Sequence, residues 1–171
     1  MEQTVNNHYL LDVSDLLRGD RRELDIDATV EVSDDIGITF IESPRITGKA
    51  VNMSGYIELS AKLIVKYETV CDRCLKELKR EMVLDIKCPI AESLENMDND
   101  EYLIPENGLI DLSELARENI ILNLPLSHLC DENCKGLCTK CGADLNQGDC
   151  GCVRVEKDPR WSVLEHFFDE D

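Results

Sequence analysis

Two stretches near the middle of the chain alternate between apolar and polar residues, which is the period of a strand with one buried face. In residues 57–67 the apolar side chains occupy the odd-numbered positions, and only Ile64 departs from the pattern. In residues 82–90 every even-numbered position is apolar, and Asp85 and Lys87 lie opposite. Because a short connection joins the two stretches, we expect them to form an antiparallel hairpin.

Shorter signals extend this sheet toward the N-terminus. Residues 45–53 predict a further strand that ends in a turn at 52–55, which makes the three strands a meander. Residues 22–32 predict a charged strand. Residues 10–19 predict a short helical or irregular element that ends at its glycine.

Helix signals follow the sheet. Residues 111–124 begin with a sequence that resembles a capping box, carry one apolar face and end before Pro125. The acidic stretch 92–108 before them predicts a solvated connector. A second helix is expected from Asp158, with an apolar stripe behind its first turn. The residues of that stripe are Trp161, Leu164, Phe167 and Phe168.

These elements predict an α+β fold. We expect an antiparallel β-sheet or partly closed barrel with packed helices, and a small C-terminal Cys-rich zinc-binding module. The expected domains are residues 1–128, which hold the sheet and the helix 111–124, and residues 129–171, which hold the module and the C-terminal helix. At 171 residues the chain suits one domain with a small appended module.

Charge is distributed unevenly along the chain. Residues 1–91 carry 12 basic and 17 acidic residues, and residues 92–171 carry 6 and 19. The second half would repel phosphate backbones, so a basic protein partner is favoured over non-specific nucleic-acid binding. The start of the chain lacks the features of a signal peptide, and no run reaches the roughly 20 apolar residues of a membrane span. We therefore expect a cytoplasmic protein without membrane contact.

Cysteines supply the strongest chemical signal. Nine is an odd number, so the cysteines cannot all pair as disulfides within the chain, and reduced thiols favour metal binding. The Cys-x2-Cys-Gly sequence at 138–142 predicts two ligands of a structural Zn²⁺, Cys138 and Cys141. The other two ligands come from four nearby cysteines, of which Cys134 and Cys150 are favoured. Cys130 and Cys152 stay open as alternatives.

A second Cys-x2-Cys pair, Cys71 and Cys74, follows the strand at 57–67. Three interpretations stay open for it: reduced turn cysteines, which we favour, a second metal site shared with C-terminal cysteines, or a redox pair. Basic residues surround the pair and are candidates for RNA contact, although charged residues also protect strand edges. These basic residues are Arg73, Lys76, Lys79 and Arg80.

No nucleophile, phosphate-binding or catalytic metal motif occurs in the chain, and its three histidines are scattered. We therefore expect a protein that is not an enzyme. This expectation narrows the function to binding, assembly or regulation.

Four stretches carry a resemblance to a known family. They are the Cys-Asp-Arg-Cys-Leu sequence at 71–75, the helix start at 110–119 with Leu-Pro-Leu at 124–126, the cysteine motif at 134–146, and Asp-Pro-Arg at 158–160. In this order they resemble the YceD family of large ribosomal RNA subunit accumulation proteins. The resemblance implies a role in accumulation of the large-subunit ribosomal RNA, which is a process and not a reaction.

Together, the residues and the resemblance lead us to expect a non-enzymatic ribosome-biogenesis factor. It would act by binding a basic ribosomal protein or a pre-large-subunit particle. Two alternatives stay open: a redox- or metal-responsive regulatory protein that uses Cys71 and Cys74, and a direct RNA-binding module that uses the basic hairpin 73–80. The sequence specifies neither the direct partner nor the oligomeric state.

Overall fold

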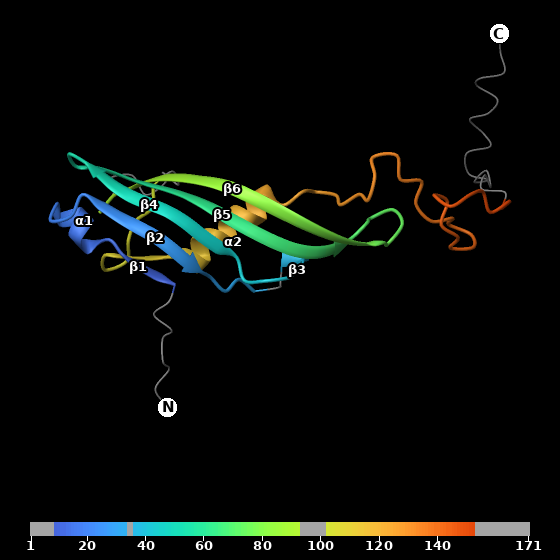
Figure 1. Ribbon diagram of the computed structural model, residues 1–171, viewed down its shortest axis with the longest axis horizontal. Coiled ribbons are helices and arrows are strands. Elements are labelled where there is room, and N and C mark those ends of the chain that lie inside the picture. Colours follow the sequence, from blue (N-terminus) through green and yellow to red (C-terminus); the bar gives the residue numbers. More distant parts are fainter. Residues whose placement is uncertain (1–8, 34–35, 93–101, 153–171) are drawn as a thin grey trace, which may run out of the picture. The chain divides into compact units, whose positions relative to one another are not determined.

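The computed structural model describes residues 9–33, 36–92 and 102–152 (Figure 1). These residues fall into two compact units. The first unit contains residues up to 69 together with 77–126, and the second contains residues 70–76 together with those from 127 onward. The helix expected from Asp158 lies outside the described residues. The second unit is thus discontinuous in sequence, because it includes the connection between two strands of the first.

The elements of the described residues occur in a fixed order along the chain. They are β1 (Leu10–Asp12), α1 (Ser14–Arg18), β2 (Glu23–Thr29), β3 (Thr39–Phe40), β4 (Arg45–Met53), β5 (Tyr56–Val70), β6 (Glu77–Ile90), β7 (Leu109–Asp111) and α2 (Leu112–Asn123).

A five-stranded sheet forms the body of the first unit (Figure 1). β4 pairs antiparallel with β2 on one side and with β5 on the other. β3 pairs with residues 67–68 of β5, and β6 also pairs with β5. This architecture confirms the expected α+β fold with an antiparallel sheet. Within the described residues the sheet does not close into a barrel.

The alternation in the sequence corresponds to the two faces of the sheet. The odd-numbered side chains of β5 from Ile57 to Tyr67 are buried, and the register places Leu59 opposite Ala50 and Leu63 opposite Ile46. A one-residue slip would turn all of these side chains toward solvent, so the apolar pattern fixes the register. On β6 the even-numbered side chains face the same core.

Helix α2 packs its apolar face against the core beneath this sheet (Figure 1). Leu112, Leu115, Ala116 and Ile120 are buried there. The helix begins where expected, because Asp111 Oδ1 accepts hydrogen bonds from backbone N–H groups in the first turn. It ends at Asn123, two residues before the proline. No helix of the described residues is long and apolar enough to span a membrane.

The segment before α2 differs from the expected solvated connector. Residues 93–101 lie outside the described part of the chain, but Leu103 packs against the core. Its N–H donates to the carbonyl of Pro89, and its own carbonyl accepts from Ala91. β7 then pairs with β1 to make a small second sheet. The connector is acidic, but its described part is held by backbone hydrogen bonds.

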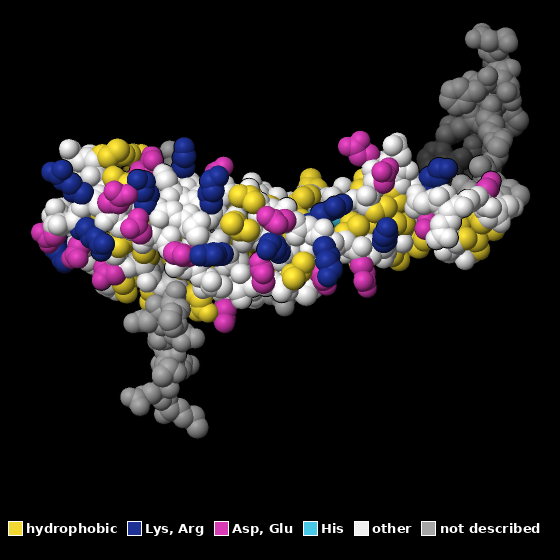
Figure 2. Space-filling view, in the orientation of Figure 1, with side chains coloured by type: hydrophobic (Ala, Val, Ile, Leu, Met, Phe, Trp, Pro, Cys, Tyr) yellow, Lys and Arg dark blue, Asp and Glu magenta, His cyan; other side chains and the backbone are white. Residues whose placement is uncertain are grey.

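The other face of the large sheet is charged. Figure 2 shows basic and acidic side chains interspersed over the strands. Several of them pair across neighbouring strands at 2.9–3.6 Å, and all of these pairs are largely exposed. They are Arg45–Asp27, Lys49–Glu23, Lys62–Asp85 and Lys79–Glu68. Exposed ion pairs add little stability, so burial of the apolar face holds the sheet together.

Gly48 marks a close approach between β4 and β5. A Cβ atom at this position would overlap the carbonyl oxygen of Ser60 and the Cα atom of Ala61. We therefore expect Gly48→Ala to lower the free energy of unfolding by about 1–3 kcal/mol, as overpacking of a core does. Urea denaturation measures the change. Thr47→Ala, one residue away on β4, is the control and should cost less; equal losses for the two variants would contradict this explanation.

Candidate metal centre

Eight of the nine cysteines gather in two groups of four within the second unit. The first cysteine group contains Cys71, Cys74, Cys130 and Cys134. The second cysteine group contains Cys138, Cys141, Cys150 and Cys152. In each group the four Sγ atoms lie within 4.8 Å of one another, and no cysteine forms a disulfide.

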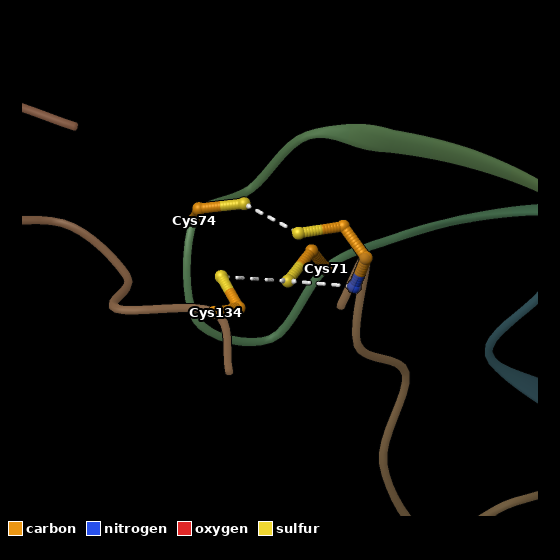
Figure 3. Close-up of side chains that lie close together, drawn as sticks. Cys71, Cys74 and Cys134 are labelled. Carbon is orange, nitrogen blue, oxygen red and sulfur yellow. Dashed lines mark hydrogen bonds between the residues drawn. The ribbon is translucent and has the colours of Figure 1, made fainter. Parts of the chain in front are cut away.

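Sulfur separations in the first cysteine group match a tetrahedral metal site. Cys71 Sγ lies 3.8 Å from Cys134 Sγ, and Cys74 Sγ lies 3.5 Å from Cys130 Sγ (Figure 3). Metal–sulfur bonds of about 2.3 Å in tetrahedral geometry require sulfur atoms about 3.8 Å apart. The residues therefore fit a metal ion at the centre of the four sulfurs without a large rearrangement.

The first Cys-x2-Cys pair is shaped by a tight turn between β5 and β6. Cys71 N–H donates to the carbonyl of Lys76, and Leu75 N–H donates to the carbonyl of Cys71, both at 2.8 Å. This turn requires Leu75 to adopt a left-handed conformation with φ of 59°, which is uncommon for a residue other than glycine. The turn brings both thiols to one side of the backbone (Figure 3).

The second Cys-x2-Cys pair repeats this turn. Cys138 N–H donates to the carbonyl of Ala143, and Gly142 N–H donates to the carbonyl of Cys138, again at 2.8 Å. Gly142 has φ of 74° and takes the left-handed position that Leu75 takes in the first turn. The two groups are therefore built on the same backbone turn, although the residue after the second cysteine differs.

Backbone donors stabilise one thiolate in each group. The pKa of Cys71 falls to about 6, because the N–H groups of Cys130, Cys74 and Arg73 together outweigh the opposing effect of burial. The N–H of Cys130 lies 3.4 Å from Cys71 Sγ. The pKa of Cys138 also falls to about 6, chiefly through the backbone N–H groups of Cys141 and Lys140.

Neighbouring sulfurs have the opposite effect on other thiols of the two groups, whose pKa they raise. Hydrogen bonds to Cys134 and Cys74 raise the pKa of Cys130 to about 12. Hydrogen bonds to Cys141 and Cys150 raise the pKa of Cys152 to about 12. Four sulfurs this close cannot all carry a negative charge unless a cation lies among them, so both groups have the electrostatics of a cation site.

Asn146 connects the segments that carry the two groups. Its Nδ2 donates to Cys134 Sγ at 3.5 Å, and its Oδ1 accepts from the N–H of Lys135 at 2.8 Å. The same Nδ2 also donates to Asp144 Oδ1. Hydrogen bonds of this kind orient a metal ligand and stabilise its charged form.

Asp72 and Arg73, between the cysteines of the first turn, anchor the chain that returns to it. Asp72 Oδ2 accepts from the N–H of His128 at 2.7 Å, and the N–H of Asp72 donates to the carbonyl of His128 at 2.9 Å. The guanidinium of Arg73 donates to the carbonyl of Cys134 at 2.9 Å. A Cβ at Gly136 would lie 2.8 Å from the Arg73 carbonyl, so this approach requires glycine.

The described residues of the second unit form almost no hydrocarbon core. Among its described residues, the buried hydrophobic side chains are Cys71, Cys134, Cys138 and Leu145. Three of these four are cysteines. Within the described residues one buried leucine offers little apolar burial, so the two sulfur groups are the main candidates for holding this part of the unit together.

The expected ligand set is divided between the two groups. The second cysteine group contains three of the expected ligands, Cys138, Cys141 and Cys150, and its fourth member is Cys152. The remaining expected ligand, Cys134, lies in the first cysteine group with Cys71 and Cys74. Cys130, named as an alternative, joins Cys134 in the first cysteine group. Of the three interpretations given for the pair Cys71 and Cys74, this arrangement corresponds to the shared metal site. Cys88 lies apart and packs against the core of the first unit.

The four basic residues considered for RNA contact do not share one unit. Arg73 and Lys76 belong to the second unit, and Lys79 and Arg80 belong to the first. Arg73 makes the structural hydrogen bonds described above, and Lys79 Nζ lies 3.0 Å from Glu68 Oε1. At least two of the four side chains therefore already have partners within the protein.

Fold and site together define a class of protein: an antiparallel sheet whose longest hairpin contributes one cysteine pair to a discontinuous module with two four-cysteine groups. The chain belongs to the family described as large ribosomal RNA subunit accumulation protein YceD, whose model matches residues 59–168. That range contains every cysteine of both groups.

The chain is also similar to individual proteins. A chloroplastic YCED homolog 1 from Arabidopsis thaliana, a large ribosomal RNA subunit accumulation protein, is 43% identical over 60 residues, which is 35% of this chain and 19% of that protein. An uncharacterized Mycobacterium bovis protein is 30% identical over 98 residues, covering 55% of this chain and 47% of the relative. The protein YlbN of Bacillus subtilis is 23% identical over 157 residues, or 88% and 91% of the two chains.

This chain thus spans about a fifth of the Arabidopsis relative and about half of the mycobacterial one. No solved structure matches it.

The shared turn leads to a reciprocal prediction. Gly142→Val should lower the stability of the second unit by about 1–2 kcal/mol, because a branched residue is strained in the left-handed conformation. Leu75→Gly should leave that stability unchanged or raise it by up to about 1 kcal/mol. Hydrogen exchange of the amides in residues 127–152 measures both effects. Equal losses in the two variants would show that the turns are not equivalent.

Proposed function

We propose that this protein is a non-enzymatic ribosome-biogenesis factor that supports accumulation of the large-subunit ribosomal RNA. It does so by holding a basic ribosomal protein or an assembly intermediate, and two Zn²⁺ ions hold its second unit together. The observation that carries this proposal is the family match over residues 59–168, since the family is described by large ribosomal RNA subunit accumulation. The compartment that fits this role is the cytoplasm.

Zinc is the metal that the ligand chemistry favours. Four thiolates suit Zn²⁺, and a closed set of four leaves no open position for a substrate, as in structural zinc sites. An iron–sulfur cluster fits less well, because its thiolates bind separate iron atoms and therefore lie farther apart than the sulfurs of either group. In this proposal Zn²⁺ supplies cross-linking and no catalysis.

Charge supports a basic protein as the partner. The formal net charge is −18 without metal. Each tetrathiolate zinc site adds four negative charges and two positive ones, so two sites bring the net charge to about −22. A field of this sign attracts a basic protein and repels RNA, which favours protein binding over the alternative of direct RNA contact.

Two zinc ions per chain are expected in protein purified without chelator. Cys74→Ser should reduce the content to about one ion by removing a ligand of the first cysteine group, and Cys141→Ser should do the same for the second. Cys88→Ser should keep both ions, since Cys88 belongs to neither group. Elemental analysis with native mass spectrometry measures the ratio. A full complement in either ligand variant, or a different metal in the wild type, would contradict this assignment.

Association with the assembling ribosome is tested by sedimentation. Tagged protein in a lysate of its own cells should co-sediment with precursors of the large subunit and be absent from mature ribosomes. Ribonuclease treatment of isolated complexes should leave the protein bound to a ribosomal protein, because the proposed contact is with protein. Absence from every precursor fraction would refute the proposal, and release by ribonuclease would favour the RNA-binding alternative.

A further inference from the structure

A groove of about 500 Å³ lies in the first unit between α2, β7 and the segment that precedes β7. Its apolar lining includes Leu10, Leu103 and Leu115. Four carboxylate side chains also line it: Glu106, Asp111, Glu114 and Glu118. We call this the acidic groove. No lysine or arginine is among the described residues that line it.

The carboxylates of the acidic groove differ from those on the large sheet. On the sheet, several acidic side chains pair with lysine or arginine of a neighbouring strand, as Glu23 does with Lys49. Among the described residues, Glu106, Glu114 and Glu118 have no ion pair within 4.0 Å. The groove therefore combines apolar surface with carboxylates that form no ion pair within 4.0 Å among the described residues.

Part of this charge serves the helix. Asp111 caps α2, and Glu114 lies in its first turn, where negative charge stabilises a helix. Glu118 lies beyond the first turn, and Glu106 precedes β7, so neither gains from the helix N-terminus. The helix thus accounts for two of the four carboxylates and not for Glu106 and Glu118.

The geometry of α2 also sets the spacing between carboxylates of the acidic groove. Residues 111, 114 and 118 follow one another at intervals of three and four, which places them along one side of α2, about 5–6 Å apart per step. In an extended peptide, every second side chain points to the same side, at intervals of about 6.6–6.8 Å. Basic residues at alternate positions can therefore meet successive carboxylates while the residues between them contact other surfaces of the groove.

We propose that the acidic groove binds an extended segment of a basic protein in which lysine or arginine alternates with apolar residues. This inference rests on the proposed function and specifies where and how the basic partner is held. Phosphate backbones are excluded by the same carboxylates, because like charges repel at short range. The apolar lining adds affinity that charge alone would not give, since the occupant removes it from water.

The test uses the full chain and a short fluorescent peptide in which lysine and leucine alternate, with binding followed by anisotropy. The variant Glu106→Gln/Glu118→Gln removes the two carboxylates that do not serve the helix N-terminus. It should weaken binding of the peptide by about tenfold at physiological salt. The control Asp25→Asn/Glu81→Gln removes the same charge from the outer face of the sheet and should change the affinity less than twofold. Thermal melting should show that both variants stay folded.

Three outcomes would overturn the inference that the acidic groove binds a basic segment. They are no peptide binding by the wild type, equal affinities in the groove and control variants, or displacement of the peptide by an oligoadenylate RNA. Selective weakening in the groove variant, with no effect of the RNA, supports it. The sedimentation experiment separates this inference from the proposed function. If the wild type co-sediments with precursors but the groove variant binds the peptide as tightly as the control variant does, only the inference about the acidic groove is wrong. If the wild type does not co-sediment, the proposed function fails first.

Discussion

The four sulfurs of the first cysteine group are the constraint on which the second unit depends. They join the turn at 71–74 to residues 130–134, which are 56 to 63 positions away in sequence. Closing a loop of this length costs conformational entropy, and the described part of the unit buries only Leu145 as a hydrocarbon side chain to offset it. Binding of a structural zinc ion contributes on the order of 10–16 kcal/mol in small domains, which is enough to dominate such a unit.

The first unit is stabilised differently. Its core joins side chains of the five-stranded sheet, α1 and α2 in one cluster, so apolar burial alone can hold it. The charges on the outer face of its sheet are mostly paired and exposed, and they contribute more to solubility than to stability. The first unit is therefore held by an apolar core, whereas the described residues of the second gather around two groups of cysteine sulfurs.

Much of the first unit could be predicted from the sequence, because residues close together in the chain determine its main strands and its long helix. The alternation in β5 and β6 and the capping residue Asp111 each indicate an element from neighbouring residues alone. The grouping of the cysteines was not predictable in the same way. Cys134 has three residues between it and Cys130 and three between it and Cys138, so spacing cannot decide its group. Only the tertiary path decides, because the Arg73 guanidinium and the backbone of Asp72 hold the returning chain beside the turn. The one available signal was the repeated Cys-x2-Cys sequence, but Leu75 in place of glycine concealed the repeated turn.

The discontinuity of the second unit also has a consequence for synthesis. Cys71 leaves the ribosome 59 residues before Cys130, and translation at about 5–20 residues per second makes this an interval of roughly 3–12 seconds. During that time the first turn can form with its hairpin, but its thiols lack half of their group. The order of translation thus gives every nascent chain a period with two cysteines whose partners have not yet been made, and both cysteine groups are complete only after residue 152 has been added.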